Sequence, residues 1–406
     1  MKLRFFLILV LLAVCLPHVS AAGLTDSIVA GWRHSLSLDV RPSYAFNSYR
    51  DDILSKILDL DNAKNTRLAT SVHLQYGFSF PSNSRQGRIC SQAWQGIGTA
   101  VNFMGNPKGL GTPVSIYAFQ GAPVWSLTDR LSVYYEWNFG VSFGWRPCDG
   151  YMGASNLIVG SRVNAYINLG GGLRWRLNDT YSLMAGLNLT HYSNGNTSFP
   201  NPGVNLAGLR LGIVRYMGRQ DMGRRFSTAD GSTDSNFTER SFNPRRPEFD
   251  LTLYGALRKR VYRGGETPVL LSGRFAVAGL DIAPMWRVTR NFRTGPSLDL
   301  QWDESTDLKR HHVSGDTSED IRFTRPPFLR QVCVGLSGRA ELVMPIFSVN
   351  VGLGYNVFGP EETRATYQLA NLKIRLTDAL YINIGYQLLD FQKQNNLMLG
   401  VGYTIR

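Results

Sequence analysis

Apolar and polar residues alternate along much of this chain with a period of two, which is the pattern of β-strands with one apolar face. The clearest run lies at residues 131–145, where every odd position from Leu131 to Trp145 is apolar or aromatic and most even positions are polar or glycine. Residues 163–176 and 181–193 repeat the pattern. Strands of this length that are apolar on one side only are typical of a wall facing lipid rather than a small core.

The alternation predicts strands along the whole chain. Short turns at Leu127-Thr128-Asp129, Asn178-Asp179 and Thr377-Asp378 fall at one end of the predicted strands, and longer loops fall mostly at the other, as in barrels with short periplasmic turns. Residues 51–61 carry a weak helical spacing within a loop. The predicted strands lie near residues 35–46, 69–80, 96–104, 113–125, 131–145, 163–176, 181–193 and 205–213, and eight more start near Phe249, Val269, Thr294, Phe328, Phe347, Tyr367, Leu380 and Asn395.

We therefore predict an all-β fold, a transmembrane antiparallel β-barrel. Two architectures fit the strands: a single barrel of about 14–16 strands, which we prefer, and two eight-stranded barrels joined by the polar, basic segment 217–247. A soluble secreted sandwich is the remaining alternative.

The first residues have the composition of an export signal, with basic Lys2 and Arg4, an apolar run, and the small-residue cleavage site Val19-Ser20-Ala21. No later stretch has the roughly 18 consecutive apolar residues of a transmembrane helix. The predicted organisation is a signal peptide at 1–22, a barrel half at 23–216, a linker or plug at 217–247 and further barrel strands at 248–406.

The formal charge of +13 suits contact with phosphorylated lipid headgroups, and the predicted export makes nucleic acid an improbable partner. Cys333 alternates with polar residues and is predicted to lie in the barrel lumen. Cys90 and Cys148 could pair in an oxidising compartment, although the predicted topology places them at opposite barrel ends, which argues against the pairing. No HExxH, CxxC or Gly-rich phosphate loop occurs, so we expect no cofactor and no metal.

The candidate chemistry lies at the end of the strand 181–193. His191 and Ser193 continue its apolar face and are neighbours on it, because they are two residues apart. Asn205 falls on the apolar face of the next strand. An imidazole and a hydroxyl side by side can act as base and nucleophile, an amide can orient the imidazole, and Asn194 with the amides near Gly195 can donate to an oxyanion.

The segment Thr190-His191-Tyr192-Ser193-Asn194-Gly195, with Asn201-Pro202-Gly203, resembles the PagL-type lipid A 3-O-deacylases, which are grouped with acyloxyacyl hydrolase-like outer-membrane barrels. Residues 135–140 and 160–166 also look like longer members of this group, and the likeness is clearest over residues 36–216. The resemblance implies a bacterial outer-membrane serine esterase whose His/Ser/Glu triad removes an ester-linked acyl chain from lipid A of lipopolysaccharide.

Carried over to this sequence, His191 would be the general base and Ser193 the nucleophile, while Asn194 and, more weakly, Asn201 would stabilise the oxyanion. The acid of the triad falls on Asn205, which is a departure from the family pattern. An amide can orient an imidazole but cannot stabilise an imidazolium as a carboxylate does. A non-catalytic barrel, either a porin or a scaffold that retains the motif as a remnant, is therefore the alternative function.

Overall fold

The computed structural model describes residues 32–406 except for 47–66, 82–83, 85–86, 88–91, 106, 148–158, 199–200, 202, 218–245, 260, 263–268, 271–272, 290, 313–320, 325 and 392. The predicted signal peptide, the helical spacing at 51–61, nearly all of the segment 217–247, and both Cys90 and Cys148 lie outside the described residues. In the described part of the chain, no α-helix is long and apolar enough to cross a membrane.

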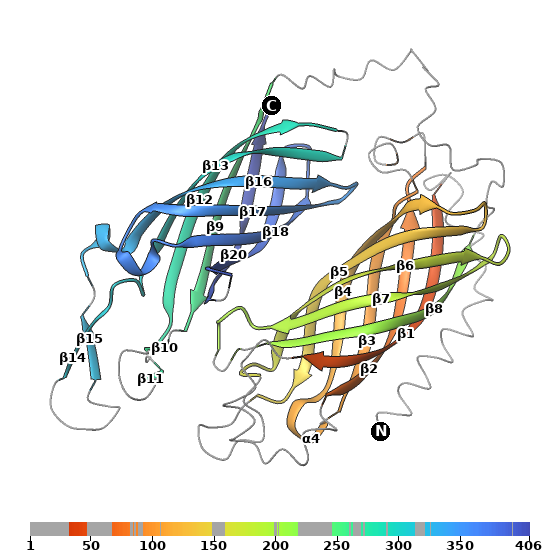
Figure 1. Cartoon of the computed structure of the whole chain (residues 1–406), viewed down its shortest axis with the longest axis horizontal. Coiled ribbons are helices and arrows are strands. Elements are labelled where there is room, and N and C mark those ends of the chain that lie inside the picture. Colours follow the sequence, from red (N-terminus) through yellow and green to blue (C-terminus); the bar gives the residue numbers. More distant parts are fainter. Residues whose placement is uncertain are drawn as a thin grey trace.

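The first half of the chain forms a closed antiparallel barrel of eight strands in sequence order (Figure 1). The barrel closes where β8 returns to β1, with Leu38 opposite Ile213 and Val40 opposite Leu211. A four-residue helix, α4 (Pro107–Leu110), precedes the fourth strand. The strands are β1 (Arg33–Phe46), β2 (Leu68–Ser79), β3 (Trp94–Met104), β4 (Gly111–Ser126), β5 (Leu131–Trp145), β6 (Val163–Arg176), β7 (Tyr181–Ser193) and β8 (Val204–Met217).

The second half forms another closed eight-stranded barrel, which is sealed by pairing of β20 with β9, as at Val401 and Leu253. Two small hairpins lie outside it, β10 (Val261–Tyr262) with β11 (Val269–Leu270), and β14 (Lys309–His312) with β15 (Ile321–Thr324). Two 3₁₀ turns, η4 (Phe328–Gln331) and η5 (Glu361–Thr363), precede β16 and β18. The barrel strands are β9 (Glu248–Arg258), β12 (Phe275–Arg287), β13 (Phe292–Asp303), β16 (Val332–Val343), β17 (Phe347–Phe358), β18 (Thr366–Arg375), β19 (Leu380–Leu389) and β20 (Lys393–Ile405).

These two closures confirm the all-β barrel class and exclude the sandwich. They also correct the preference for one large barrel, since the alternative of two eight-stranded barrels is what forms. Alternation within a strand is the same in both architectures, because it reports which face is apolar and not which strand the last one pairs with. Two strand starts were also wrong: Val269 lies in the short hairpin and Phe328 in a 3₁₀ turn, so those barrel strands begin at Phe275 and Val332.

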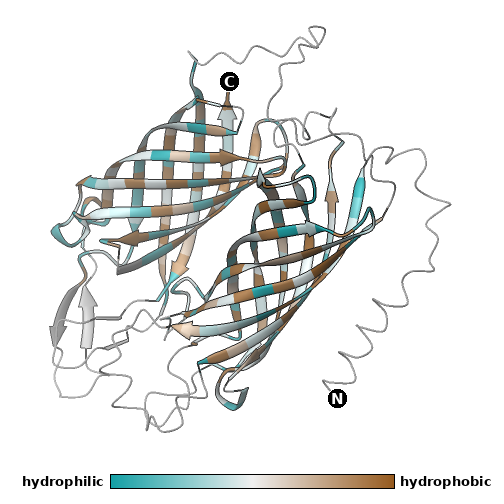
Figure 2. Ribbon diagram, turned by 45° about the vertical axis from the view of Figure 1, so that its right-hand side comes forward, coloured by the Kyte–Doolittle hydropathy of each residue, from teal (hydrophilic) through white to brown (hydrophobic). Residues whose placement is uncertain are grey.

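In both barrels the exposed large side chains are mostly apolar and face outward, whereas the buried charged and polar side chains share the lumen with aromatic rings. Figure 2 shows hydrophobic and hydrophilic residues alternating along the strands. Eight strands leave an interior just wide enough for side chains to fill it. Each lumen contains a buried cluster of two cationic and two acidic groups. They are Arg41 and Arg210 with Asp39 and Glu136 in the first barrel, and Arg293 and Lys373 with Asp250 and Glu341 in the second. Cys333 also points inward and is buried, as predicted.

Trp145 departs from the alternation of its strand. The sequence pattern places it on the outward face of β5, but it is 2% exposed and lies inside, where its indole N–H donates to Ser142 Oγ at 2.8 Å. Gly144, with φ +88°, lies in the left-handed region that favours glycine, and the register between β4 and β5 shifts beside it. Such an irregularity changes the face of the sheet to which the following side chains point, and a strict period of two in the sequence does not reveal it.

The two barrels lie side by side in both views (Figures 1 and 2). The turn between β16 and β17 of the second barrel lies against β5: the ring of Trp137 meets that of Phe347 edge to face at 5.4 Å, and Tyr135 Oη donates to Met344 Sδ at 3.5 Å. The outward face of β5 near its start is consequently only half-exposed, whereas outward leucines of β6 and β7 remain open. The first half of β5, the strand with the clearest lipid-facing pattern, therefore faces the second barrel.

Candidate active site

His191 and Ser193 lie on the outer surface of the first barrel, at the end of β7 opposite the short turns. They continue a row of outward side chains that includes Leu187 and Leu189, while Tyr192 between them is buried in the lumen. Both are partly exposed. On the neighbouring strand β6, the residue opposite Ser193 is Ala165, which has a small side chain.

Asn205 stands directly opposite His191 in the pairing of β7 with β8. The His191 Nδ1 atom lies 2.7 Å from Asn205 Oδ1. An amide oxygen can only accept a hydrogen bond, so this contact requires the hydrogen on Nδ1 and leaves the lone pair on Nε2. The pairing of two strands thus brings together the imidazole and the amide that the sequence placed on matching faces.

Glycine at position 203 is required by the close approach of the chain to the imidazole. Its φ of +80° is in the left-handed region, and a Cβ there would lie 2.9 Å from His191 Cε1 and 3.1 Å from the carbonyl oxygen of Tyr192. A side chain at Gly203 would therefore push the ring out of its place opposite Asn205.

A compact loop after Ser193 is held together by asparagine side chains. The buried Asn194 donates its backbone N–H to Asn201 Oδ1 at 2.9 Å, and its own Oδ1 accepts the backbone N–H of Ser198 at 3.3 Å. The Nδ2 group of Asn194 is buried and has no hydrogen-bond partner among the described residues. Asn201 also donates to Asn196 Oδ1 at 3.3 Å. Asn201 is therefore engaged in shaping the loop, while Asn194 retains a free donor.

Aromatic rings fill the lumen beneath this end of β7. Tyr192 meets Trp145 edge to face at 5.0 Å and Tyr166 at 5.4 Å, and its hydroxyl donates to Asn102 Oδ1 at 2.8 Å. Tyr166 also packs on Tyr117 at 5.0 Å. Packed aromatic rings therefore lie beneath the strand that carries His191 and Ser193. Trp145, which the sequence pattern placed on the outward face, is one of these rings.

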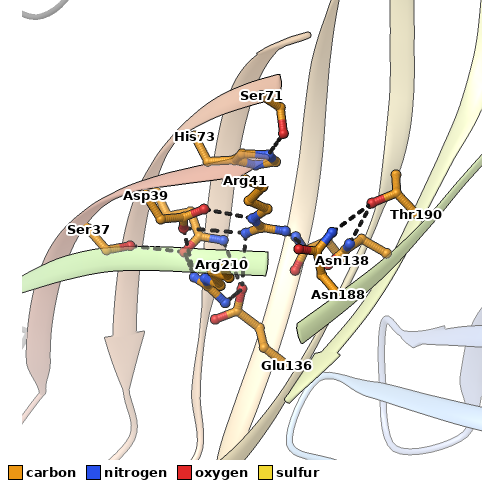
Figure 3. Close-up of polar contacts among 12 residues, drawn as sticks. Ser37, Asp39, Arg41, Ser71, His73, Glu136, Asn138, Asn188, Thr190 and Arg210 are labelled. Atoms are coloured by element: carbon orange, nitrogen blue, oxygen red, sulfur yellow. Dashed lines mark hydrogen bonds and ion pairs between the residues drawn. The ribbon is translucent and has the colours of Figure 1, made fainter. Parts of the chain in front are cut away.

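No carboxylate from the described part of the first barrel is placed to replace the missing acid. Asp39 and Glu136 lie in the lumen, where both are bound by Arg210 at 2.8 Å (Figure 3), and Asp129 and Asp179 lie in the short turns at the far end. Within the described residues no group of three or more His, Cys, Asp or Glu side chains is placed to hold a metal ion. The lumen cluster itself was missed by sequence reasoning, although inward charged positions on apolar strands were its visible signal.

Two family models match the chain. The model described as lipid A 3-O-deacylase (PagL) matches residues 70–214, and that of the acyloxyacyl hydrolase C-terminal domain (PagL_C) matches residues 247–406. The fold and the position of the site define an outer-membrane β-barrel with polar groups on its lipid-facing surface. The chain belongs to the family of PagL-type lipid A 3-O-deacylases and acyloxyacyl hydrolase-like proteins of the bacterial outer membrane.

Solved structures that resemble parts of the chain have low sequence identity to it. The outer-membrane enzyme PagL is 18% identical, covering 43% of this chain and 97% of its own, with a TM-score of 0.27. Neisserial surface protein A is 10% identical, covering 45% and 96%, with a TM-score of 0.31. Ail of Yersinia pestis is 12% identical, covering 46% and 99%, with a TM-score of 0.25. No curated protein sequence matches the chain.

Proposed function

We propose that this protein is a serine esterase that removes an ester-linked acyl chain from lipid A. The observation that carries the proposal is the contact of His191 Nδ1 with Asn205 Oδ1 at 2.7 Å on the lipid-facing surface. Ser193 is the next side chain after His191 on the same face of β7. Open leucines such as Leu187 and Leu189 lie on the same surface, so an acyl chain can contact them without leaving the bilayer. Removal of Ser193, argued in the Discussion, is the experiment that tests the proposal.

In the proposed mechanism, Nε2 of His191 takes the proton of Ser193 Oγ as that oxygen attacks the acyl carbonyl. The Cα atoms of alternate residues in a strand are roughly 7 Å apart, which lets an imidazole and a hydroxyl on one face meet. His191 then returns the proton to the sugar oxygen, which leaves as a hydroxyl. Water, deprotonated by the same imidazole, cleaves the acyl–Ser193 ester and releases the fatty acid.

The donor for the developing oxyanion is proposed to be Asn194. Its unpartnered Nδ2 supports this role, because a buried donor without an acceptor costs free energy in the free protein, and an oxyanion would supply the acceptor. We expect Asn194→Ala to lower kcat by about a hundredfold with little change in KM, since the bond forms with the charge of the transition state. Asn201→Ala is the comparison: we expect a smaller loss, because Asn201 holds the loop. If Asn194→Ala raised KM by as large a factor as it lowered kcat, the assignment would be contradicted.

Replacing the amide opposite His191 by a carboxylate is expected to raise activity. Asn205→Asp places a charge beside Nδ1, which stabilises the imidazolium that forms when Nε2 accepts a proton, and charge-assisted hydrogen bonds are roughly twice as strong as neutral ones. We expect a gain of about tenfold in kcat, which corresponds to about 1.4 kcal/mol. Measurement is by release of fatty acid from lipid A in mixed micelles. Asn205→Ala, which leaves the ring without its partner, should lose activity, and a loss in both variants would count against the proposed base.

The packed lumens speak against the porin alternative. The charged cluster of the first barrel is at most 2% exposed, and a cavity lined by Arg293, Glu341 and Lys373 in the second holds only about 10 Å³, about one water molecule. Conductance in planar bilayers, without loss of acyl chains in lipid A, would restore that alternative. If neither conductance nor deacylation is found, the remaining interpretation is a non-catalytic scaffold.

A further inference from the structure

The second barrel touches the loop that follows Ser193. The backbone N–H of Lys259, just after β9, donates to the carbonyl oxygen of Asn196 at 2.8 Å. Asn196 in turn donates from its side chain to the backbone carbonyl of Asn395 on β20 at 3.4 Å. Gly195 faces Leu397, also on β20, so closely that a Cβ on the glycine would lie 2.6 Å from both methyl carbons of the leucine.

These contacts fall at the end of the second barrel opposite the Trp137–Phe347 contact. The barrels therefore touch in two places, with β5 beside the β16–β17 turn, and the candidate active site beside the end of β9 and the start of β20. Tilted strands explain how β5 and the β7–β8 loop face the same neighbour. The loop thus lies between its own strands, β7 and β8, and the residues of β9 and β20 in the second barrel.

We propose that the second barrel is a positioning element for the candidate active site, with Leu397 as its principal positioning residue. The inference rests on the proposed function. Gly195 and Asn196 both have a positive φ, at +62° and +66°, so the loop adopts a conformation that a free chain of this sequence would not hold uniquely. Hydrogen bonds from Lys259 and to Asn395, with packing against Leu397, select that conformation and so fix Asn194 beside Ser193.

Fixing the loop matters because a misplacement of about 1 Å in a catalytic group can cost on the order of a hundredfold in rate. Each barrel is sealed by its own strand pairing, so the first barrel does not need the second one in order to close. The proposed function of the second barrel is instead to position the loop. Its contribution is to the rate of the reaction rather than to the binding of the acyl chain.

The test is a double-mutant cycle across the two barrels, in the full-length protein. Gly195→Ala introduces both an unfavourable φ and an overlap with Leu397, and we expect kcat to fall by about a hundredfold. Leu397→Ala removes the three carbon atoms that the new Cβ would meet, so the double variant should regain about tenfold. The remaining tenfold loss reflects the left-handed backbone at an alanine. Leu397→Ala alone should lower kcat several-fold and leave KM within about twofold.

Two controls separate this coupling from general damage. Leu399→Ala changes the next outward side chain of β20, which is 46% exposed, and should neither reduce kcat nor rescue Gly195→Ala. Gly203→Ala strains the other end of the loop against His191, and Leu397→Ala should not rescue it. Heat-modifiable gel mobility establishes that each variant forms its barrels.

The outcomes are distinguishable from those of the proposed function. If Ser193→Ala abolishes deacylation but the double variant is no better than Gly195→Ala, the positioning role is overturned and the esterase stands. Rescue by Leu399→Ala equal to that by Leu397→Ala overturns it as well. If Ser193→Ala leaves deacylation intact, the proposed esterase fails, and with it the positioning role.

Discussion

Ser193→Ala is expected to abolish deacylation of lipid A, with a fall in kcat on the order of 10⁴ to 10⁶-fold, as found when the nucleophile of a serine hydrolase is removed. Among the described residues of the neighbouring strand β6, the partner of Ser193 is Ala165, which has no hydroxyl that could replace that of Ser193. His191→Ala should lose nearly as much, because the two side chains act as one unit. Mass spectrometry of lipid A from cells producing each variant is the measurement.

A matched control lies on the same strand. Ser182→Ala removes a serine hydroxyl from the other end of β7, where the side chain points into the lumen and is 2% exposed, and it should leave lipid A deacylation unchanged. A serine-directed phosphonate should label the wild type and Ser182→Ala but not Ser193→Ala. Unchanged lipid A in wild-type and Ser193→Ala cells alike would remove the esterase and leave the scaffold alternative.

Arg210→Met is expected to destabilise the first barrel by about 3–5 kcal/mol, the cost of leaving a buried charge without its partner. The Arg210 guanidinium lies 2.8 Å from Asp39 Oδ2 and 2.8 Å from Glu136 Oε1, and all three groups are at most 2% exposed (Figure 3). Arg41, 2.6 Å from Asp39 Oδ1, is the second cation of the cluster. Removing Arg210 leaves two carboxylates sharing one guanidinium in a lumen without bulk water. The shift in urea midpoint, followed by heat-modifiable mobility, measures the loss.

Restoring the charge balance should restore much of the stability. In Arg210→Met/Glu136→Gln, one cation and one anion remain, and we expect more than half of the loss to be recovered because the uncompensated charge is gone. Arg130→Met makes the same change of charge in an exposed turn and should stay within about 0.5 kcal/mol of the wild type. If the double variant were as unstable as Arg210→Met, packing of the arginine side chain rather than its charge would hold the lumen together.

Alternation with a period of two determined most of the strands and their faces, and the membrane barrel class. It placed His191, Ser193 and Asn205 correctly on the outward face, because a strand presents alternate residues to one side whatever its neighbours are. The motif and its family resemblance supplied the chemistry, and the departure at Asn205 was visible in the sequence alone. The roles of these residues in catalysis remain predictions.

Only the tertiary structure decided how the strands close. Whether β8 pairs with β1 or continues into a larger barrel depends on pairing between residues far apart in the sequence, such as Leu38 and Ile213, and no local pattern encodes it. The same closure put charged residues that are scattered in the sequence into one lumen cluster. Separately, the irregularity at Gly144 turned Trp145 inward. The approach of Leu397 to Gly195 joins segments about 200 residues apart, so it exists only once both barrels have closed and stand together.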